Sequence, residues 1–401
     1  MESKRNVKKA TITCIHESII IHILCFLPAE IVTRCRSVCK NWATLISSPC
    51  FAEAYATSGT APLQFLLHGT VSSTFKRAHL AFAHLAESSR DSNAPRYDCP
   101  GRVAESVLPD NFGTEYSHIT ICSVCNFTGF VVAYVHGDKF WRRNEPYHIF
   151  NPTTRQHIVV KKYEKFWCWT HCALLFAHKT KKLKLLYFFS DTVGKIQTIG
   201  TGLWRTVTTD SLSSSVRFSG LSFPCFLNGI YHWYSSCHVM ICFNAETEVF
   251  HQIPAPKCVE SQDISKLGVL DGCLCVCTKG TDKSFEFLVM NEYGVAESWT
   301  KKFVIANDGD VHTRIKRIVE PLNFLKNGEI VVQCRDNNLI CYNPSSGNSK
   351  LITDHDKVHC HLNNSPIAYV PSFRRIRLEK FRWTQKQRVY GVLQVLKILL
   401  K

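Results

Sequence analysis

The residues whose spacing best suits metal binding are Cys122 and Cys125, two cysteines separated by two residues. A structural zinc site needs four ligands and usually a second pair of this kind, and the sequence has no second C-x-x-C. Positions three apart on a strand also point to opposite faces. The spacing therefore argues against a zinc site at this pair.

Two further groups of possible metal ligands occur near the C-terminal end. The first group shares one face of an expected strand: Cys273, Cys275 and Cys277. We expect these thiols to pack in a core, where reduced cysteine behaves as a small hydrophobe. The second is the densest histidine cluster of the chain: His355, His359 and His361 with Cys360. His359 and His361 could share a face, but no partner cluster is visible, so a surface loop is the alternative. We predict no metal and no other cofactor.

An aromatic and lysine-rich region could bind nucleic acid. Trp167, Cys168 and Trp169 precede a turn at 179–184 that carries four lysines. Aromatic rings can stack on bases while lysines contact phosphates. Lysine-rich turns between strands are also typical of solvated faces that prevent edge pairing, and this is the interpretation we favour.

Catalytic motifs are missing from the sequence. It has no phosphate-binding G-x-x-x-x-G-K-[ST], no G-x-G-x-x-G that opens a helix, no G-x-S-x-G and no H-E-x-x-H. Gly220-Leu221-Ser222-Phe223-Pro224 fails the nucleophile pattern at its last position. We therefore predict a protein that binds rather than catalyses.

Length and composition indicate a folded protein with room for a small module and one large domain. The 401 residues are 45% hydrophobic and 20% charged, with a net charge of +16 that favours acidic partners. No apolar run is long enough to span a membrane, and His16, Glu17 and His22 interrupt the only run that could suggest a signal peptide. The 20 cysteines sit within apolar runs, so we expect reduced thiols and a location in the cytoplasm or nucleus.

The segment 15–55 is expected to form three short helices, at about 17–26, at about 28–36, and around a stripe of Val38, Trp42, Leu45 and Ile46. Apolar residues surround the first helix on every side, and such a helix must be covered on every side. About forty residues bury too little surface to do this alone. An apolar face is therefore left for another part of the chain or for a partner.

The same segment resembles the plant-type F-box. The residues that match this family in order are Ile23-Leu24, Leu27-Pro28, Cys35, Val38-Cys39-Lys40, Trp42 and Ser48-Pro49-Cys50-Phe51. The chain departs from the family pattern at two places: Ile15-His16 stands where the family has Leu-Pro, and His22 stands where an acidic residue is usual.

The resemblance implies docking on a Skp-type adaptor, which connects an F-box protein to a cullin–RING ubiquitin ligase. The residues we expect to contact the adaptor are Ile15, Ile19, Leu24, Leu27, Pro28, Val38, Lys40 and Trp42. The alternative is a helical cap packed on the C-terminal domain of the same chain.

From about Ile119 to Val370 the apolar period alternates, as in strands. Tight hairpin turns are expected at Asn228-Gly229, Asp271-Gly272, Asn327-Gly328 and Thr128-Gly129. A second kind of turn follows strands that end in asparagine: Asn151, Asn244, Asn291 and Asn343, with Phe188-Phe189-Ser190-Asp191 in the same slot. These turns recur roughly every 40 to 53 residues, which favours a propeller of four-stranded blades over a sandwich. Five repeats are visible, and strands from 62–85 and the C-terminal end could build a sixth.

This region is also similar to the F-box-associated domain of plant proteins. The matching motifs lie at 147–155 (YHIFNPTTR), 202–207 (GLWRTV), 226–233 (FLNGIYHW), 242–254 (CFNAETEVFHQIP), 270–275 (LDGCLC) and 299–305 (WTKKFVI). The paired glycines of true kelch repeats are missing.

The expected organisation is α+β and multidomain, with a three-helix F-box before a propeller-like all-β domain of five to six blades. Its parts are a disordered basic N-terminus (1–14), the F-box (15–55), a connector with first strands (56–118), the propeller (119–373) and a basic extension (374–401). The extension has apolar residues at helical spacing and could lie on a membrane surface or an acidic partner, or pack on the propeller.

Three functional hypotheses follow. The first is a non-catalytic substrate receptor of a Skp–cullin–F-box ligase that holds an acidic protein client on its propeller loops. The second is a basic nucleic-acid-binding propeller with a non-functional F-box. The third and weakest is a propeller enzyme.

Overall fold

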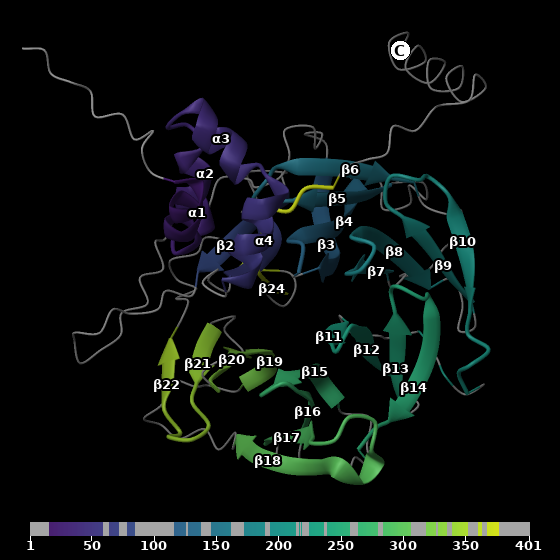
Figure 1. The fold of residues 1–401 in the computed structure, drawn as a ribbon. Coiled ribbons are helices and arrows are strands. Elements are labelled where there is room, and N and C mark those ends of the chain that lie inside the picture. Colours follow the sequence, from purple (N-terminus) through teal and green to yellow (C-terminus); the bar gives the residue numbers. More distant parts are fainter. Residues whose placement is uncertain are drawn as a thin grey trace, which may run out of the picture.

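The structure is a computed structural model, shown in Figure 1. It describes residues 16–58, 64–71, 78–84, 116–125, 127–137, 146–161, 172–188, 193–213, 216, 218, 224–235, 239–256, 264–279, 284–305, 318–325, 328–334, 339–351, 360–362 and 367–376.

The N-terminal module has four helices rather than the expected three. They are α1 (Glu17–Cys25), α2 (Ala29–Cys35), α3 (Lys40–Ile46) and α4 (Pro49–Thr57). The fourth helix was not expected from the sequence, and it begins at Pro49. The Ser48 hydroxyl accepts a hydrogen bond from the Phe51 amide at 3.1 Å, and Pro49 occupies the first turn, so Ser-Pro starts a helix here. No helix in the described part of the chain has the length and apolar content needed to cross a membrane.

Six antiparallel sheets follow the helices, and Figure 1 shows them around a ring. Blade 1 consists of β3 (Tyr116–Cys125), β4 (Phe130–Gly137), β5 (Tyr147–Asn151) and β6 (Gln156–Val160). Blade 2 consists of β7 (Cys172–Ala177), β8 (Lys182–Phe188), β9 (Val193–Thr198) and β10 (Trp204–Thr208). Blade 3 is β11 (Cys225–Leu227), β12 (Ile230–Ser235), β13 (Val239–Asn244) and β14 (Val249–Pro254). Blade 4 consists of β15 (Ile264–Leu270), β16 (Cys273–Lys279), β17 (Phe285–Met290) and β18 (Trp299–Ile305). Blade 5 consists of β19 (Ile318–Phe324), β20 (Ile330–Cys334), β21 (Leu339–Tyr342) and β22 (Ser349–Leu351). The prediction of a propeller is confirmed.

Blade 6 joins the two ends of the domain. Its strands are β1 (Gln64–Val71), β2 (Ala78–His84), β23 (Cys360–Leu362) and β24 (Ile367–Tyr369). β23 and β24 pair with successive halves of β1, with Gly69 opposite Leu362 and Gln64 opposite Tyr369. The expected sixth blade therefore exists, and it closes the ring by pairing N-terminal with C-terminal strands.

Two of the four expected tight hairpin turns form as the sequence predicts, whereas at Thr128-Gly129 only the glycine has a positive φ, of 67°. Asn228 and Gly229 have φ values of 53° and 81°, and Asp271 and Gly272 have 52° and 78°. Two successive positive φ angles are what a type I′ turn requires, and Asn-Gly and Asp-Gly adopt them at low cost. Gly328 also has a positive φ of 82°, while Asn327 lies outside the described residues.

The second kind of turn is built on asparagine side chains. The Oδ1 atoms of Asn151, Asn244 and Asn343 each accept hydrogen bonds from the backbone amides two and three residues later. This Asx geometry ends the third strand and starts the hairpin to the fourth. Asn291 differs, because its side-chain amide donates to the Ser298 carbonyl across the loop at 3.1 Å.

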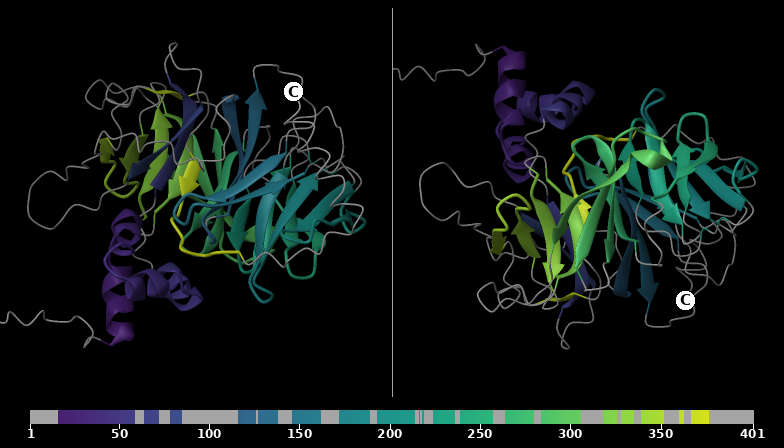
Figure 2. Two further views of the ribbon diagram at one scale, coloured as in Figure 1. Left: turned by 90° about the horizontal axis from the view of Figure 1, so that it is seen from above. Right: turned by 90° about the horizontal axis from the view of Figure 1, so that it is seen from below.

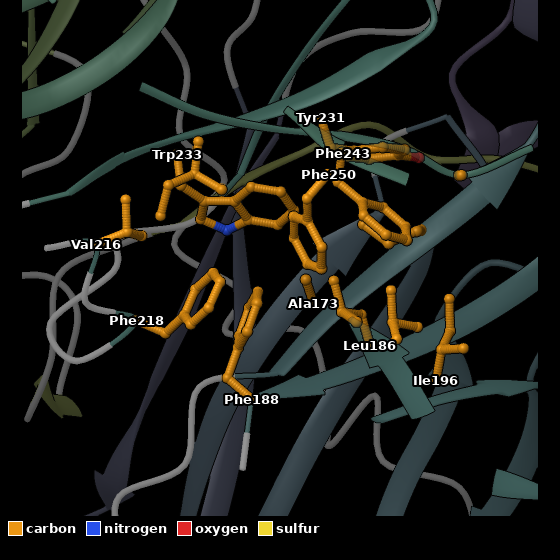
Figure 3. Packing of buried hydrophobic residues seen from close by; sticks show 14 of the residues in the cluster. Ala173, Leu186, Phe188, Ile196, Val216, Phe218, Tyr231, Trp233, Phe243 and Phe250 are labelled. Carbon is orange, nitrogen blue, oxygen red and sulfur yellow. The ribbon is translucent and has the colours of Figure 1, made fainter. Parts of the chain in front are cut away.

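The hydrophobic core lies between successive blades. Figure 3 shows the cluster between blades 2 and 3, where Phe188 stacks on Phe218 with ring centroids 4.4 Å apart and meets Trp233 edge-on at 5.9 Å. Similar clusters join blades 1 and 2, 3 and 4, and 4 and 5. Blades 1 to 5 therefore each share a core with a neighbouring blade, as repeated units that stack on one another do.

The helical module projects from one face of the propeller, as both views in Figure 2 show. Its own core includes Leu24, Val32, Ile46 and Phe51, each at most 1% exposed. One residue from the far end of the described chain, Phe373, completes that core.

Candidate docking surface

The helical module exposes large apolar side chains that its own core leaves uncovered. Ile19, Ile23 and Phe26 are 53%, 52% and 62% exposed. Their spacing of i, i+4 and i+7 places them along one face of α1 and its C-cap, and we call them the α1 stripe. Ile31 in α2 and Val38 before α3 are exposed as well, at 40% and 58%. Half of all large exposed hydrophobic residues in the described chain therefore belong to this small module.

The opposite face of α1 explains why the helix is apolar all round. Ile20 and Leu24 point into the module's core, at 9% and 1% exposed, and pack with residues of α2, α3 and α4. The Tyr55 hydroxyl of α4 donates a hydrogen bond to the Leu27 carbonyl at 3.1 Å and fixes the end of α1. This chain therefore covers the inward face of α1, and the outward face stays exposed.

Polar groups border the α1 stripe. The His22 ring lies edge-on against Phe26, with centroids 4.9 Å apart and planes at 90°. At the start of the helix, the Ser18 amide donates to His16 Nδ1 at 3.3 Å, so His16 supplies the N-cap. Apolar anchors with a polar rim are the usual composition of a protein–protein interface.

The residues predicted to contact an adaptor are placed differently from one another. Four are exposed: Ile19, Pro28, Val38 and Lys40. Leu27 and Trp42 are half-buried and pack against the module's core, while Ile15 lies outside the described residues. The prediction that Leu24 contacts the adaptor is corrected here, because its side chain is 1% exposed and lies in the module's core, where a partner cannot reach it.

Sequence reasoning missed three exposed residues, Ile23, Phe26 and Ile31. The signal for the first two was present, since they follow Ile19 at helical spacing. The sequence analysis chose Leu24 of the F-box motif instead. In a helix that is apolar on every side, the sequence does not show which face is covered by the rest of the module.

The cysteines considered as metal ligands lie in cores between blades. Cys125 is 3% exposed in the cluster that joins blades 1 and 2, and Cys122 packs against the same cluster. Cys275 and Cys277 are fully buried between blades 4 and 5, with Cys273 beside them. Among the residues that the structure describes, no three His, Cys, Asp or Glu side chains are placed to hold a metal ion.

Burial also makes the propeller's thiols poor nucleophiles. Burial raises the pKa of Cys225 and of Cys242 to about 12.

Two groups of candidate residues lie outside the residues whose side chains are described. They are the cluster His355, His359, Cys360 and His361, and the aromatic group Trp167, Cys168 and Trp169.

The lysine-rich turn at 179–184 divides into exposed and buried members. Lys179, Lys181 and Lys182 are exposed. Lys184 is 5% exposed, and its Nζ donates to the Ala245 carbonyl at 2.6 Å and to Glu248 at 2.7 Å. Lys184 therefore joins blade 2 to blade 3 and is not available to a phosphate.

Glu248 is held ionised by two cations of blade 2. Its carboxylate accepts hydrogen bonds from Lys184 and from both terminal nitrogens of Arg205. Burial opposes ionisation of Glu248, but the hydrogen bonds from Arg205 and Lys184 outweigh it and keep the pKa of the carboxyl below its ordinary value.

The described chain thus combines a closed propeller with a helical module that exposes an apolar face. Comparison with known families identifies both parts: residues 12–53 match the F-box domain, and residues 82–366 match the F-box associated beta propeller domain. The chain belongs to the plant-type F-box proteins that carry this propeller domain.

Known relatives agree with the family. The chain is 24% identical to F-box protein At3g07870 of Arabidopsis thaliana, over 88% of this chain and 94% of the relative. It is 25% identical to F-box/kelch-repeat protein At3g23880 of the same organism, over 81% of this chain and 86% of the relative.

Proposed function

We propose that this chain is the non-catalytic substrate receptor of a Skp–cullin–F-box ubiquitin ligase, acting in the cytoplasm or nucleus. A Skp-type adaptor covers the α1 stripe together with Val38, Pro28 and Lys40, and the cullin–RING ligase joins through the adaptor. The observation that carries the proposal is the exposed α1 stripe on a module of the F-box family.

The mechanism is proximity. The module holds the ligase while the propeller holds a client protein, so that lysines of the client meet the ubiquitin-loaded enzyme at a high effective concentration. Tethering of this kind raises encounter rates by orders of magnitude without a catalytic group on the receptor.

The client is proposed to be acidic, since the chain carries a net charge of +16. Its binding should weaken as salt is added, because screening reduces attraction between exposed charges. The exposed lysines at 179–182 keep a second candidate open, a basic propeller that binds nucleic acid. A steep salt dependence of RNA or DNA binding without adaptor binding would select that candidate.

The direct test is binding of a purified plant Skp-type adaptor to the full chain. Phe26→Asp, which buries a charge in the proposed interface, should abolish adaptor binding. The matched control is Val249→Asp. Val249 lies in β14 of the propeller, and its side chain is 52% exposed, as is that of Ile23 in the α1 stripe. The control should bind as the wild type does. Undiminished adaptor binding by Phe26→Asp, with the propeller folded in both variants, would refute the proposed docking surface.

A further inference from the structure

We propose that Phe373 and Arg374 are positioning residues that fix the orientation of the F-box relative to the propeller. They belong to the segment that follows the last strand, residues 370–376, which we call the strap. The importance of a fixed orientation for ubiquitin transfer rests on the function proposed above, but the structural role of the strap does not.

Phe373 is part of the F-box core although it follows blade 6 in the chain. Its side chain is 4% exposed. The ring meets Phe51 at a centroid distance of 5.3 Å and Tyr55 at 4.9 Å, both edge-on, at 73° and 82°. Aromatic pairs with this geometry add stabilisation beyond the area they bury. The strap is therefore anchored in the F-box at α4.

Arg374 contacts the F-box and the propeller at the same time. Its Nη2 donates to Glu53 Oε2 of α4 at 2.7 Å. The guanidinium carbon lies 4.4 Å from the centroid of the Phe127 ring in blade 1 and 5.5 Å from that of Phe176 in blade 2. The Arg374 side chain is 12% exposed, so its cation–π contacts are largely protected from water, whereas the Glu53 side chain is 47% exposed and the ion pair is partly solvated.

Blade 1 holds the strap in place from the other side. Asn151 Nδ2 donates to the carbonyls of Ser372 and Arg374 at 2.9 and 3.2 Å. The side-chain Nε2 of Gln156 donates to the backbone carbonyl of Ile376 at 2.7 Å, and its Oε1 accepts from the backbone amide of Ile376 at 2.8 Å. These hydrogen bonds join side chains of blade 1 to the backbone of the strap, so they fix its path irrespective of the strap's own side chains.

The space between blade 1 and the strap is too small for a side chain at Gly129. A Cβ at this position would lie 2.8 Å from the Ser372 Cβ and 2.9 Å from the Ser372 amide nitrogen. The strap is thus packed directly onto the β3–β4 turn.

The strap is a second connection between the F-box and the propeller, besides the covalent one that leads to β1. Five residues, 59–63, separate the described part of the F-box from β1. Five residues span at most about 18 Å. The strap, which bonds to both parts, restrains the angle between them.

A rigid receptor holds the adaptor and the client at a constant separation. Effective concentration depends on whether the linkage permits both sites to be engaged at the productive distance. Loosening the strap is therefore expected to reduce ubiquitin transfer without reducing affinity for the adaptor, because the α1 stripe lies on a different face of the module from Phe51 and Tyr55.

The test is a distance distribution between two probes on the full chain, measured without any adaptor. Genetically encoded spin-label residues are placed at Asn41 in α3 and Val304 in β18, both exposed. The wild type should give one narrow distribution, and Phe373→Ala/Arg374→Ala should give a broad one. The matched control is Glu286→Ala, which removes an ion pair with Lys301 within blade 4 and should leave the distribution narrow.

A milder pair of variants covers the case in which loss of Phe373 unfolds the F-box. Arg374→Glu places a carboxylate against Glu53 and should broaden the distribution, and Glu53→Arg/Arg374→Glu should narrow it again. A distribution as narrow as the wild type's in Arg374→Glu, or in a folded double-alanine variant, overturns the proposal. Failure of the wild type to bind an adaptor would refute the proposed function and leave this result unaffected.

Discussion

The side-chain nitrogen of Asn151 lies 2.9 Å from the carbonyl oxygen of Ser372, a residue 221 positions later in the chain. The same nitrogen is 3.2 Å from the carbonyls of Thr128 and Arg374. The Oδ1 atom accepts two backbone amides, as it does at Asn343 in blade 5. One asparagine thus ends a strand of blade 1 and also holds the strap.

Replacing Asn151 by aspartate should separate these two roles. One carboxylate oxygen of the aspartate can still accept the two backbone amides. The other oxygen replaces the NH2 group and faces three carbonyl oxygens that it cannot donate to. Asn151 is fully buried, so water cannot compensate. We expect a loss of about 3–5 kcal/mol in the free energy of unfolding, the usual cost of an uncompensated buried charge. Urea denaturation at neutral pH measures it.

Asn343→Asp is the matched control for this prediction. It preserves the oxygen that caps the same kind of turn, so a change within about 0.5 kcal/mol is expected. Equal losses in Asn151→Asp and Asn343→Asp would show that the bonds to the strap add nothing to stability.

The two faces of α1 should respond differently to alanine. Leu24→Ala removes a buried side chain and should cost about 2–5 kcal/mol of the F-box's stability. Ile23→Ala removes a side chain that is 52% exposed, so stability should change by less than about 0.5 kcal/mol while adaptor binding weakens. Thermal unfolding and titration with the adaptor measure the two quantities. A large loss of stability in Ile23→Ala would mean that the stripe is already covered in the free chain.

The sequence predicts features that depend on local chemistry. Asn228-Gly229 and Asp271-Gly272 form tight turns because their residue types favour positive φ wherever they occur. The pairing that closes blade 6 was also predictable, since a ring of strands leaves no edge. Leu24 was placed on the wrong face because its neighbours in α1 are apolar in every direction. Arg374 could not be placed, because Glu53, its partner, is 321 positions away and no local pattern connects them.

Acid should weaken blade 1 through a pair of stacked histidines. His148 Nδ1 lies 3.0 Å from His157 Nε2, and their rings are nearly parallel, at 8°. Burial, together with repulsion from His157, lowers the pKa of His148 to about 4. The ordinary value is near 6.5, so the unfolded chain takes up the proton first. The contribution of His148 is complete above pH 6.5 and is lost as the pH falls toward 4, at about 1.4 kcal/mol per pH unit.

The pH dependence of the melting temperature checks this prediction, with His148→Gln as the test variant. Glutamine does not titrate, so the variant's melting temperature should fall less steeply between pH 6.5 and 4 than that of the wild type. Some slope will remain, because burial also lowers the pKa of His232 to about 4. Identical slopes in wild type and variant would exclude His148 as a source of acid sensitivity.

The ion pair between blades 2 and 3 should be far more costly to break than the exposed pair in blade 4. Lys184 and Glu248 side chains are 6% and 16% exposed, whereas Lys301 and Glu286 are 52% and 30% exposed. Glu248→Ala leaves the Lys184 ammonium buried without its counter-charge and should cost about 3–5 kcal/mol. Glu286→Ala leaves a solvated lysine and should cost about 1 kcal/mol or less.

A second variant distinguishes the buried charge from the lost contact. Lys184→Met/Glu248→Gln removes both charges together and should recover much of the stability that Glu248→Ala loses, because a buried pair replaced by neutral groups carries no desolvation penalty. Urea denaturation of the three variants supplies the comparison. If the double variant were as unstable as Glu248→Ala, packing and the hydrogen bond to the Ala245 carbonyl would account for the effect, and charge would not.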